Sequence, residues 1–141
     1  MIVRKYIKGD FDKLELQAAQ RCGNELDNLK IDDISETTDI WVGEHEGKII
    51  AMGGVVEIWN NRGEAWMLIS NHAKFSLMLS VHKEVANYLK RSNYRRIEST
   101  VDVGFKQGHR WMKMLGFELE GYLKAYRPDG KDMILFARVR R

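Results

Sequence analysis

Hydrophobic positions change their spacing along the chain, and each change predicts a new element. Apolar residues in positions 2–7 predict a first strand that ends at Gly9 and Asp10. Asp10 is suited to N-cap a helix that stops near Gly23. A more polar helical pattern over residues 25–36 predicts a second helix.

From residue 40 the apolar positions recur with period two, which predicts strands. The expected strands, joined by short turns, cover residues 40–44, 48–59 and 64–70. The two hairpins predict an antiparallel meander. Both faces of the middle strand are apolar, so we expect helices on both sides of the sheet.

A long amphipathic helix is predicted from Phe75 to Leu89, followed by a fifth strand over residues 94–101. Because a helix separates them, the fourth and fifth strands are expected to be parallel. A shorter helix over residues 107–115 precedes a closing hairpin. Its strands are expected over residues 117–126 and 132–139, around the turn sequence Arg-Pro-Asp-Gly.

The length of 141 residues is typical of one domain, and we expect residues 1–141 to form it. The composition, 44% hydrophobic and 30% charged, is that of a globular protein without a membrane span. The N-terminus has no apolar core after its charges, so a cytoplasmic location is the default expectation. Cys22, the single cysteine, is expected to be a small buried side chain, and no metal site is expected.

Basic residues are in small excess, with a net charge of +3 and a pI near 9.0. They cluster at Lys90 and Arg91, at Arg95 and Arg96, and in the last residues of the chain. Such clusters suit an acidic partner, but the first pair also complements the end of a helix. Aromatic residues are not interleaved with these charges, so nucleic-acid binding is not expected.

Two local passages, together with the predicted order of elements, resemble the GNAT superfamily of N-acetyltransferases. Residues 44–54 are similar to its charged turn and Gly-Lys before an apolar strand, and residues 110–118 to its helix ending in Leu-Gly-Phe. The resemblance covers essentially the whole chain. It implies an α/β (α+β) fold with a mixed sheet of about seven strands, helices on both faces, and parallel, splayed fourth and fifth strands.

A narrower resemblance is to small GNAT-like proteins of tailed phages. It rests on Trp66, on a helix start at residues 71–76 without glycine, and on the late Leu-Gly-Phe of residues 115–117. This resemblance implies a location in the host cytoplasm or the virion.

The GNAT resemblance implies acetyl-CoA as cofactor, with its pantetheine arm between strands four and five and its pyrophosphate over the next helix start. The glycines usual at that start are absent from residues 70–76, so side chains would crowd a pyrophosphate. Backbone N–H groups there still suit an anion, with Lys74 as a point charge. Capping by Ser70 or Asn71 beside a solvated lysine explains the same residues. The expected cofactor-binding residues are Met67, Leu68, Ile69, Ser70, Asn71, His72, Ala73, Lys74 and Ser76.

Candidate catalytic residues follow from the chemistry of acetyl transfer, which needs a base for the amine and an acid for the thiolate. The resemblance implies a carboxylate base on the fourth strand or its neighbour, so Glu64 and Glu57 are the expected bases, although exposed glutamates at strand ends are common. Met112 stands where the resemblance implies a tyrosine, and methionine cannot donate a proton. Tyr126 is therefore the expected acid, with Tyr122 or Tyr94 as alternatives.

The expected function is acetyl-CoA-dependent transfer of an acetyl group to a primary amine, which is a protein lysine, an N-terminus or a small amine. The alternative is a catalytically degenerate phage protein that acts as a virion-associated or host-factor-binding module. A homodimer is left open.

Overall fold

The computed structural model describes residues 1–20 and 31–141. Cys22 and residues 25–30 of the second predicted helix lie outside the described residues. The strands and α-helices are β1 Ile2–Lys5, α1 Ile31–Ile34, β2 Ile40–His45, β3 Lys48–Trp59, β4 Arg62–Ile69, α2 Phe75–Arg91, β5 Arg96–Asp102, α3 Lys106–Met114, β6 Glu118–Leu123 and β7 Met133–Val139.

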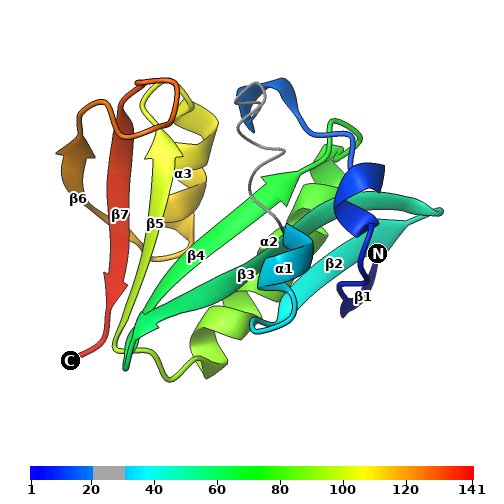
Figure 1. Ribbon diagram of the computed structural model, residues 1–141, viewed down its shortest axis with the longest axis horizontal. Coiled ribbons are helices and arrows are strands. Elements are labelled where there is room, and N and C mark those ends of the chain that lie inside the picture. Colours follow the sequence, from blue (N-terminus) through cyan, green and yellow to red (C-terminus); the bar gives the residue numbers. More distant parts are fainter. Residues whose placement is uncertain (21–30) are drawn as a thin grey trace. The chain divides into compact units, whose positions relative to one another are not determined.

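Seven strands of the described part form one mixed sheet in the order β1-β2-β3-β4-β5-β7-β6 (Figure 1). Strands β1, β2 and β3 pair antiparallel, and so do β5, β7 and β6. Strand β4 pairs with β5 in parallel, with Arg62 opposite Arg96 and Glu64 opposite Glu98. The predicted mixed sheet and its parallel fourth and fifth strands are therefore confirmed.

By Cα proximity the chain divides into two compact units, which we treat separately. Unit 1 comprises Met1–Val55 and Trp66–Val85, and unit 2 comprises Val56–Ala65 and Ala86–Arg141. Strands β3 and β4 and helix α2 contribute to both units. The single domain over residues 1–141 stays a prediction.

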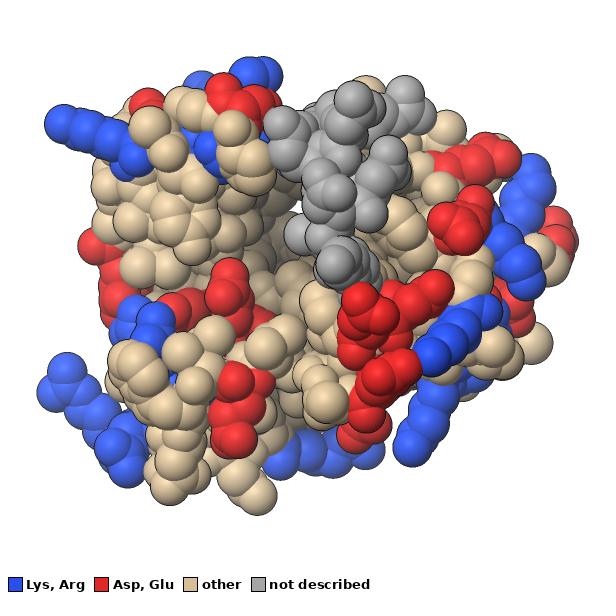
Figure 2. Space-filling view, in the orientation of Figure 1, with Lys and Arg blue, Asp and Glu red and all other residues tan. Residues whose placement is uncertain are grey.

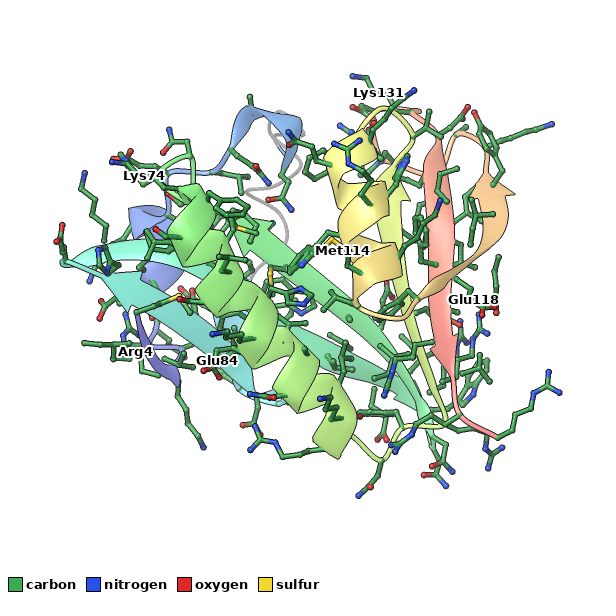
Figure 3. The ribbon with its side chains drawn as sticks, turned by 180° about the vertical axis from the view of Figure 1, so that it is seen from behind. Arg4, Lys74, Glu84, Met114, Glu118 and Lys131 are labelled. Atoms are coloured by element: carbon green, nitrogen blue, oxygen red, sulfur yellow. The ribbon has the colours of Figure 1, made fainter. Side chains whose placement is uncertain are left out.

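The core of unit 1 is a cluster of buried aliphatic side chains from α1, β2, β3 and β4. Helix α1 lies on one face of these strands and α2 on the other, as the views from the two sides show (Figures 1 and 3). Helices on both faces of the sheet were predicted from the apolar middle strand, and this arrangement explains why residues 49–52 are all buried. The cluster consists of Ile31, Ile40, Val42, Ile49, Met52 and Leu68.

The core of unit 2 forms around β5 and β7, with α3 packed on β5. Ile97 and Phe136 are fully buried there. A Cβ on Gly108 of α3 would come within 2.8 Å of a Val101 side-chain carbon, so glycine allows the close approach of helix and strand. The closing hairpin turns as predicted, with Gly130 at φ 81° and its N–H donating to the Arg127 carbonyl at 2.8 Å.

The helix predicted from Asp10 is wrong. Residues 10–20 instead contain two short 3-10 turns, Asp10–Lys13 and Ala18–Gln20. The Asp10 carboxylate does not cap a helix, because it accepts hydrogen bonds from Arg4 at 2.7 and 3.0 Å and from the Ile7 N–H at 2.7 Å. Residues between the two turns take their backbone partners from the end of β4 instead.

Candidate functional site

The turn between β4 and α2 uses most of its own backbone N–H groups. The His72 N–H donates to the Ser70 hydroxyl at 3.0 Å, and the Ala73 N–H to the Ser70 carbonyl at 3.2 Å. The Asn71 N–H donates to the Glu15 carbonyl at 2.8 Å, and the Lys74 N–H to the His72 carbonyl at 3.0 Å. Ser70 therefore stabilises the turn, and these four N–H groups already have acceptors in the chain.

Donors for an anion remain at the first turn of α2. The first helical hydrogen bond of α2 runs from the Met78 N–H to the Lys74 carbonyl at 2.9 Å. The helix itself therefore offers no acceptor to the N–H groups of Phe75, Ser76 and Leu77. No acidic residue lies in this first turn, and Lys74 is exposed at the same end (Figure 3). Helix dipole and lysine together favour a negative charge.

His72 lies beside this helix start and is paired with the carboxylate of Glu15, to which its Nε2 is hydrogen-bonded. Both side chains are solvent-accessible, at 36% and 62% exposure. Since Glu15 also accepts the Asn71 N–H through its carbonyl, it holds the turn at two points. A positioning role for His72 and Glu15 in this turn follows from the geometry.

The edge of β4 that faces away from β3 is the second feature of this region. The Ser70 N–H donates to Ile50 of β3, so by the alternation of a strand the groups of Met67 and Ile69 point to the opposite edge. There the side-chain amide of Gln20 donates to the Met67 carbonyl at 2.7 Å. Its oxygen accepts the Ile69 N–H at 2.8 Å. One glutamine amide thus meets a donor and an acceptor of β4.

Backbone contacts extend this pairing along residues 15–20, which we call the β4-edge segment. Leu16 forms an antiparallel bridge with Ser70, and the Gln17 N–H donates to the Ile69 carbonyl at 3.0 Å. Of the expected cofactor-binding residues, Met67 and Ile69 present backbone groups to this segment. Leu68 is instead buried in the core of unit 1.

In unit 2 the candidate base Glu64 lies on β4, half-buried and in register with Glu98 of β5. Glu98 is 9% exposed and is held by two arginines. Arg62 donates to it at 2.8 and 2.9 Å, and Arg96 at 2.5 Å. Hydrogen bonds from Arg62, joined by those from Arg96, lower the pKa of Glu98 although burial opposes them. Glu98 is therefore an ionised structural carboxylate.

This ion-pair network extends to β6, because Arg96 also donates to Glu120 at 2.5 and 2.9 Å. Acidic and basic side chains lie next to one another over this part of the sheet (Figure 2). The Glu64 carboxylate forms no hydrogen bond or ion pair with any residue that the structure describes, so it stays available. The network was not expected from the sequence, although Arg-x-Glu occurs at residues 62–64 and again at 96–98, a spacing that places both charges on one strand face.

The other expected catalytic residues lie in different surroundings within unit 2. Glu57 is exposed on β3. Burial of the Tyr94 hydroxyl, together with the negative charge of Glu57, raises the pKa of Tyr94. Tyr126 is 54% exposed in the loop after β6. The Tyr122 hydroxyl donates to Asp132 at 2.6 Å. Met112 is 7% exposed, so it fills the core where the resemblance implies a proton donor.

Known proteins similar to this chain were found among solved structures. A scan against protein-family models found no match, and a search of curated proteins found none. An N-acetyltransferase from Staphylococcus aureus Mu50 matches with TM-score 0.75 and 15% identity, over 98% of this chain and 96% of that one. A GNAT family acetyltransferase from Elizabethkingia anophelis with acetyl-CoA bound matches with TM-score 0.74 and 14% identity, over 99% and 97%. The chain has the GNAT fold.

A further GNAT-fold match is the spermidine/spermine N-acetyltransferase SpeG from Vibrio cholerae in complex with manganese ions. Its TM-score is 0.69 at 18% identity, over 98% of this chain and 91% of that one. In the part of the chain that the structure describes, no group of three or more His, Cys, Asp or Glu side chains is placed to hold a metal. None of the described helices is long and apolar enough to cross a membrane.

Two groups of described residues in this GNAT fold have donors and acceptors that suit parts of acetyl-CoA. The start of α2 offers N–H groups and a lysine, and the first turn of α2 contains no acidic residue, which suits a pyrophosphate. The edge of β4 binds an amide, as the contacts of Gln20 demonstrate, and pantetheine carries amides. The residues fit the cofactor chemically, on the condition that Gln20 leaves this edge.

Proposed function

We propose that the protein is an acetyl-CoA-dependent N-acetyltransferase that transfers an acetyl group to a primary amine. The observation that carries this proposal is the GNAT fold, which extends over 98–99% of the chain in matches to acetyltransferases. The acceptor amine is a protein lysine, an N-terminus or a small amine. A homodimer and a location in the cytoplasm stay predictions.

Binding of the cofactor is assigned to the start of α2 and the end of β4. Lys74 and the N–H groups of Phe75, Ser76 and Leu77 would hold the pyrophosphate by charge and hydrogen bonds. Met67 and Ile69 would hold the pantetheine amides through the backbone. Acetyl-CoA, when bound, supplies a thioester as the acyl donor.

Glu64 is the proposed general base. An ammonium group must lose a proton before it can attack, and a carboxylate takes that proton directly or through water. Glu98 cannot serve, since two arginines hold its charge. No arginine that the structure describes is hydrogen-bonded to the Glu64 carboxylate on the neighbouring strand. Tyr126 is proposed to protonate the departing thiolate, since it is an exposed hydroxyl and Met112 offers no proton.

The experiment that tests the function has a binding arm and a transfer arm. Isothermal titration calorimetry with acetyl-CoA tests binding, and mass spectrometry of a lysine peptide, an N-terminal alanine peptide and spermidine tests transfer. Two of these acceptors are suggested by matches to a ribosomal-protein-alanine N-acetyltransferase and a spermidine N-acetyltransferase. We expect heat on binding and acetylation of at least one amine. No heat and no thermal stabilisation at millimolar acetyl-CoA would contradict the proposal.

A second candidate function is favoured by the occupied edge of β4 and by buried Met112. In this proposal the chain is a catalytically degenerate GNAT-fold phage protein that acts as a virion-associated or host-factor-binding module. It predicts that acetyl-CoA gives no heat and that no amine is acetylated. Acetylation of any amine above the background without protein would remove this candidate.

A further inference from the structure

We infer that the β4-edge segment is an internal competitor for the cofactor, with the Gln20 amide occupying the backbone groups of Met67 and Ile69 that a pantetheine amide would use. The inference rests on the proposed function and deepens it. It describes an autoinhibited state from which Gln20 must be displaced before acetyl-CoA binds fully.

The Ile69 N–H carries the argument because it has a single proton to donate. It already donates to the Gln20 side-chain oxygen at 2.8 Å. A carbonyl such as that of Met67 accepts two hydrogen bonds, but an N–H satisfies one acceptor with good geometry. A ligand carbonyl that binds this N–H must therefore displace Gln20.

The orientation of the Gln20 amide is set by a neighbour. The Gln17 side-chain nitrogen donates to the Gln20 oxygen at 3.0 Å, which fixes that atom as the acceptor and leaves the Gln20 nitrogen to face Met67. The Gln17 backbone N–H also donates to the Ile69 carbonyl at 3.0 Å. The side-chain amide of Gln20 and the backbone N–H of Gln17 thus pair with β4 as the groups of an added strand would.

Glu15 and Leu16, at the other end of the β4-edge segment, have contacts of their own, so acetyl-CoA can displace Gln20 without displacing them. Glu15 stays attached through the Asn71 N–H and through its carboxylate contact with His72. Leu16 is bridged to Ser70, which lies beyond the groups that Gln20 covers. These contacts lie at residues 15 and 16, so they can stay in place when the Gln20 side chain leaves Met67 and Ile69.

The test compares acetyl-CoA binding by the unmodified protein and by Gln20→Met, which keeps a similar volume but cannot form the hydrogen bonds with Met67 and Ile69. Loss of the hydrogen bonds to Met67 and Ile69 from the competing state is expected to tighten binding about 5–30-fold in calorimetry. Gln107→Met, at an exposed position on α3, is the control and should bind as the unmodified protein does. Gln20→Glu is a second variant, because it retains an acceptor for Ile69 and loses the donor to Met67. It should bind less tightly than Gln20→Met, because its carboxylate still occupies the Ile69 N–H.

A second readout does not depend on affinity. In the unmodified protein, saturation with acetyl-CoA should shift the side-chain amide signals of Gln20 in a nitrogen–proton NMR spectrum. Without ligand, hydrogen exchange of the Ile69 N–H should be faster in Gln20→Met than in the unmodified protein.

The outcomes separate the inference from the function. Equal affinity of the unmodified protein and both Gln20 variants, or unshifted Gln20 signals at saturation, would overturn the inference and leave the proposed function intact. Absence of binding by all forms would remove the proposed function and the inference with it.

Discussion

Arg62 of β4 and Glu98 of β5 are joined by two parallel hydrogen bonds, Nε to Oε2 at 2.9 Å and Nη2 to Oε1 at 2.8 Å. The same guanidinium lies over the ring of Trp59, 4.2 Å from its centroid. The pair joins the two strands across their parallel register, where Arg62 lies opposite Arg96. The ionised carboxylate of Glu98 is therefore part of the folded structure.

Glu98→Gln should destabilise the protein by about 2–4 kcal/mol, since two guanidinium groups lose their common anion in a buried position. The control is Glu118→Gln, at an exposed position on β6, which should change stability by less than about 0.5 kcal/mol. Urea denaturation at pH 7 followed by circular dichroism measures both. Equal stability of the two variants would show that the network adds nothing.

Asp10→Asn should remove stability in a manner that depends on pH. Burial alone would raise the pKa of Asp10, but the hydrogen bonds from Arg4 and Ile7 hold that pKa below its usual value. A lowered folded-state pKa adds stability above the unfolded value of about 3.9, and this stability is lost as pH falls below it. We expect a deficit of about 2–4 kcal/mol at pH 7 that shrinks below about pH 4.

Thermal melts from pH 7 to pH 3 measure this difference. Asp12→Asn is the matched control, because Asp12 is exposed in the same 3-10 turn. Its melting temperature should follow that of the unmodified protein at each pH. A deficit of Asp10→Asn that stays constant across this range would contradict the ionic role of Asp10.

Most strands and the long helix were predictable because their patterns are local. Alternation over residues 48–59 and the helical spacing from Phe75 to Leu89 depend only on which faces are buried. The 3-10 turns that replace the helix expected from Asp10 were not predictable in this way. The Asp10 carboxylate is of the type that caps helices. It is bound instead by Arg4 and by the Ile7 N–H, and the spacing of residues in the sequence does not reveal these contacts.

The placement of residues 67–76 on a strand end and a helix start was predictable, but the contacts that this strand end makes were not. Residues 67–76 were expected from the resemblance, and the fold places them at the end of β4 and the start of α2. The contact of Gln20 with Ile69 runs from a side chain to the backbone, so no pairing of residue types in the sequence indicates it. The Glu98 network was detectable from alternating charges, but its partners required the register of β4 and β5.

Gly53→Ala should destabilise unit 1 by about 1–3 kcal/mol through overpacking. A Cβ at this position of β3 would lie 2.6 Å from the Trp66 carbonyl oxygen, a backbone atom that cannot move aside alone. Gly121→Ala is the control, because its Cβ would meet nothing within 4 Å. Chemical denaturation of both variants measures the difference. Equal effects would contradict the close approach of β3 and β4.

Lys74→Ala should weaken acetyl-CoA binding about 3–10-fold at low salt, because one cation beside a helix N-terminus is lost. Lys83→Ala, exposed further along α2, should bind as the unmodified protein does. Calorimetry at two ionic strengths provides the check, since the deficit of Lys74→Ala should shrink as salt screens the charge. A deficit that does not depend on salt, or one shared by Lys83→Ala, would contradict a phosphate contact.

Glu64→Gln should lower the rate of acetylation about 10²–10⁴-fold at neutral pH if Glu64 is the general base. Glu57→Gln discriminates between the two candidate bases. Because Glu57 is exposed on β3, we expect this variant to acetylate within about twofold of the rate of the unmodified protein. An alkyl amine with a pKa near 10 becomes neutral in solution as pH rises, so the deficit of Glu64→Gln should shrink toward about pH 10. A purely structural role for Glu64 would lower the rate equally at every pH. Rates measured from pH 7 to pH 10 with one amine therefore separate proton removal from support of the fold.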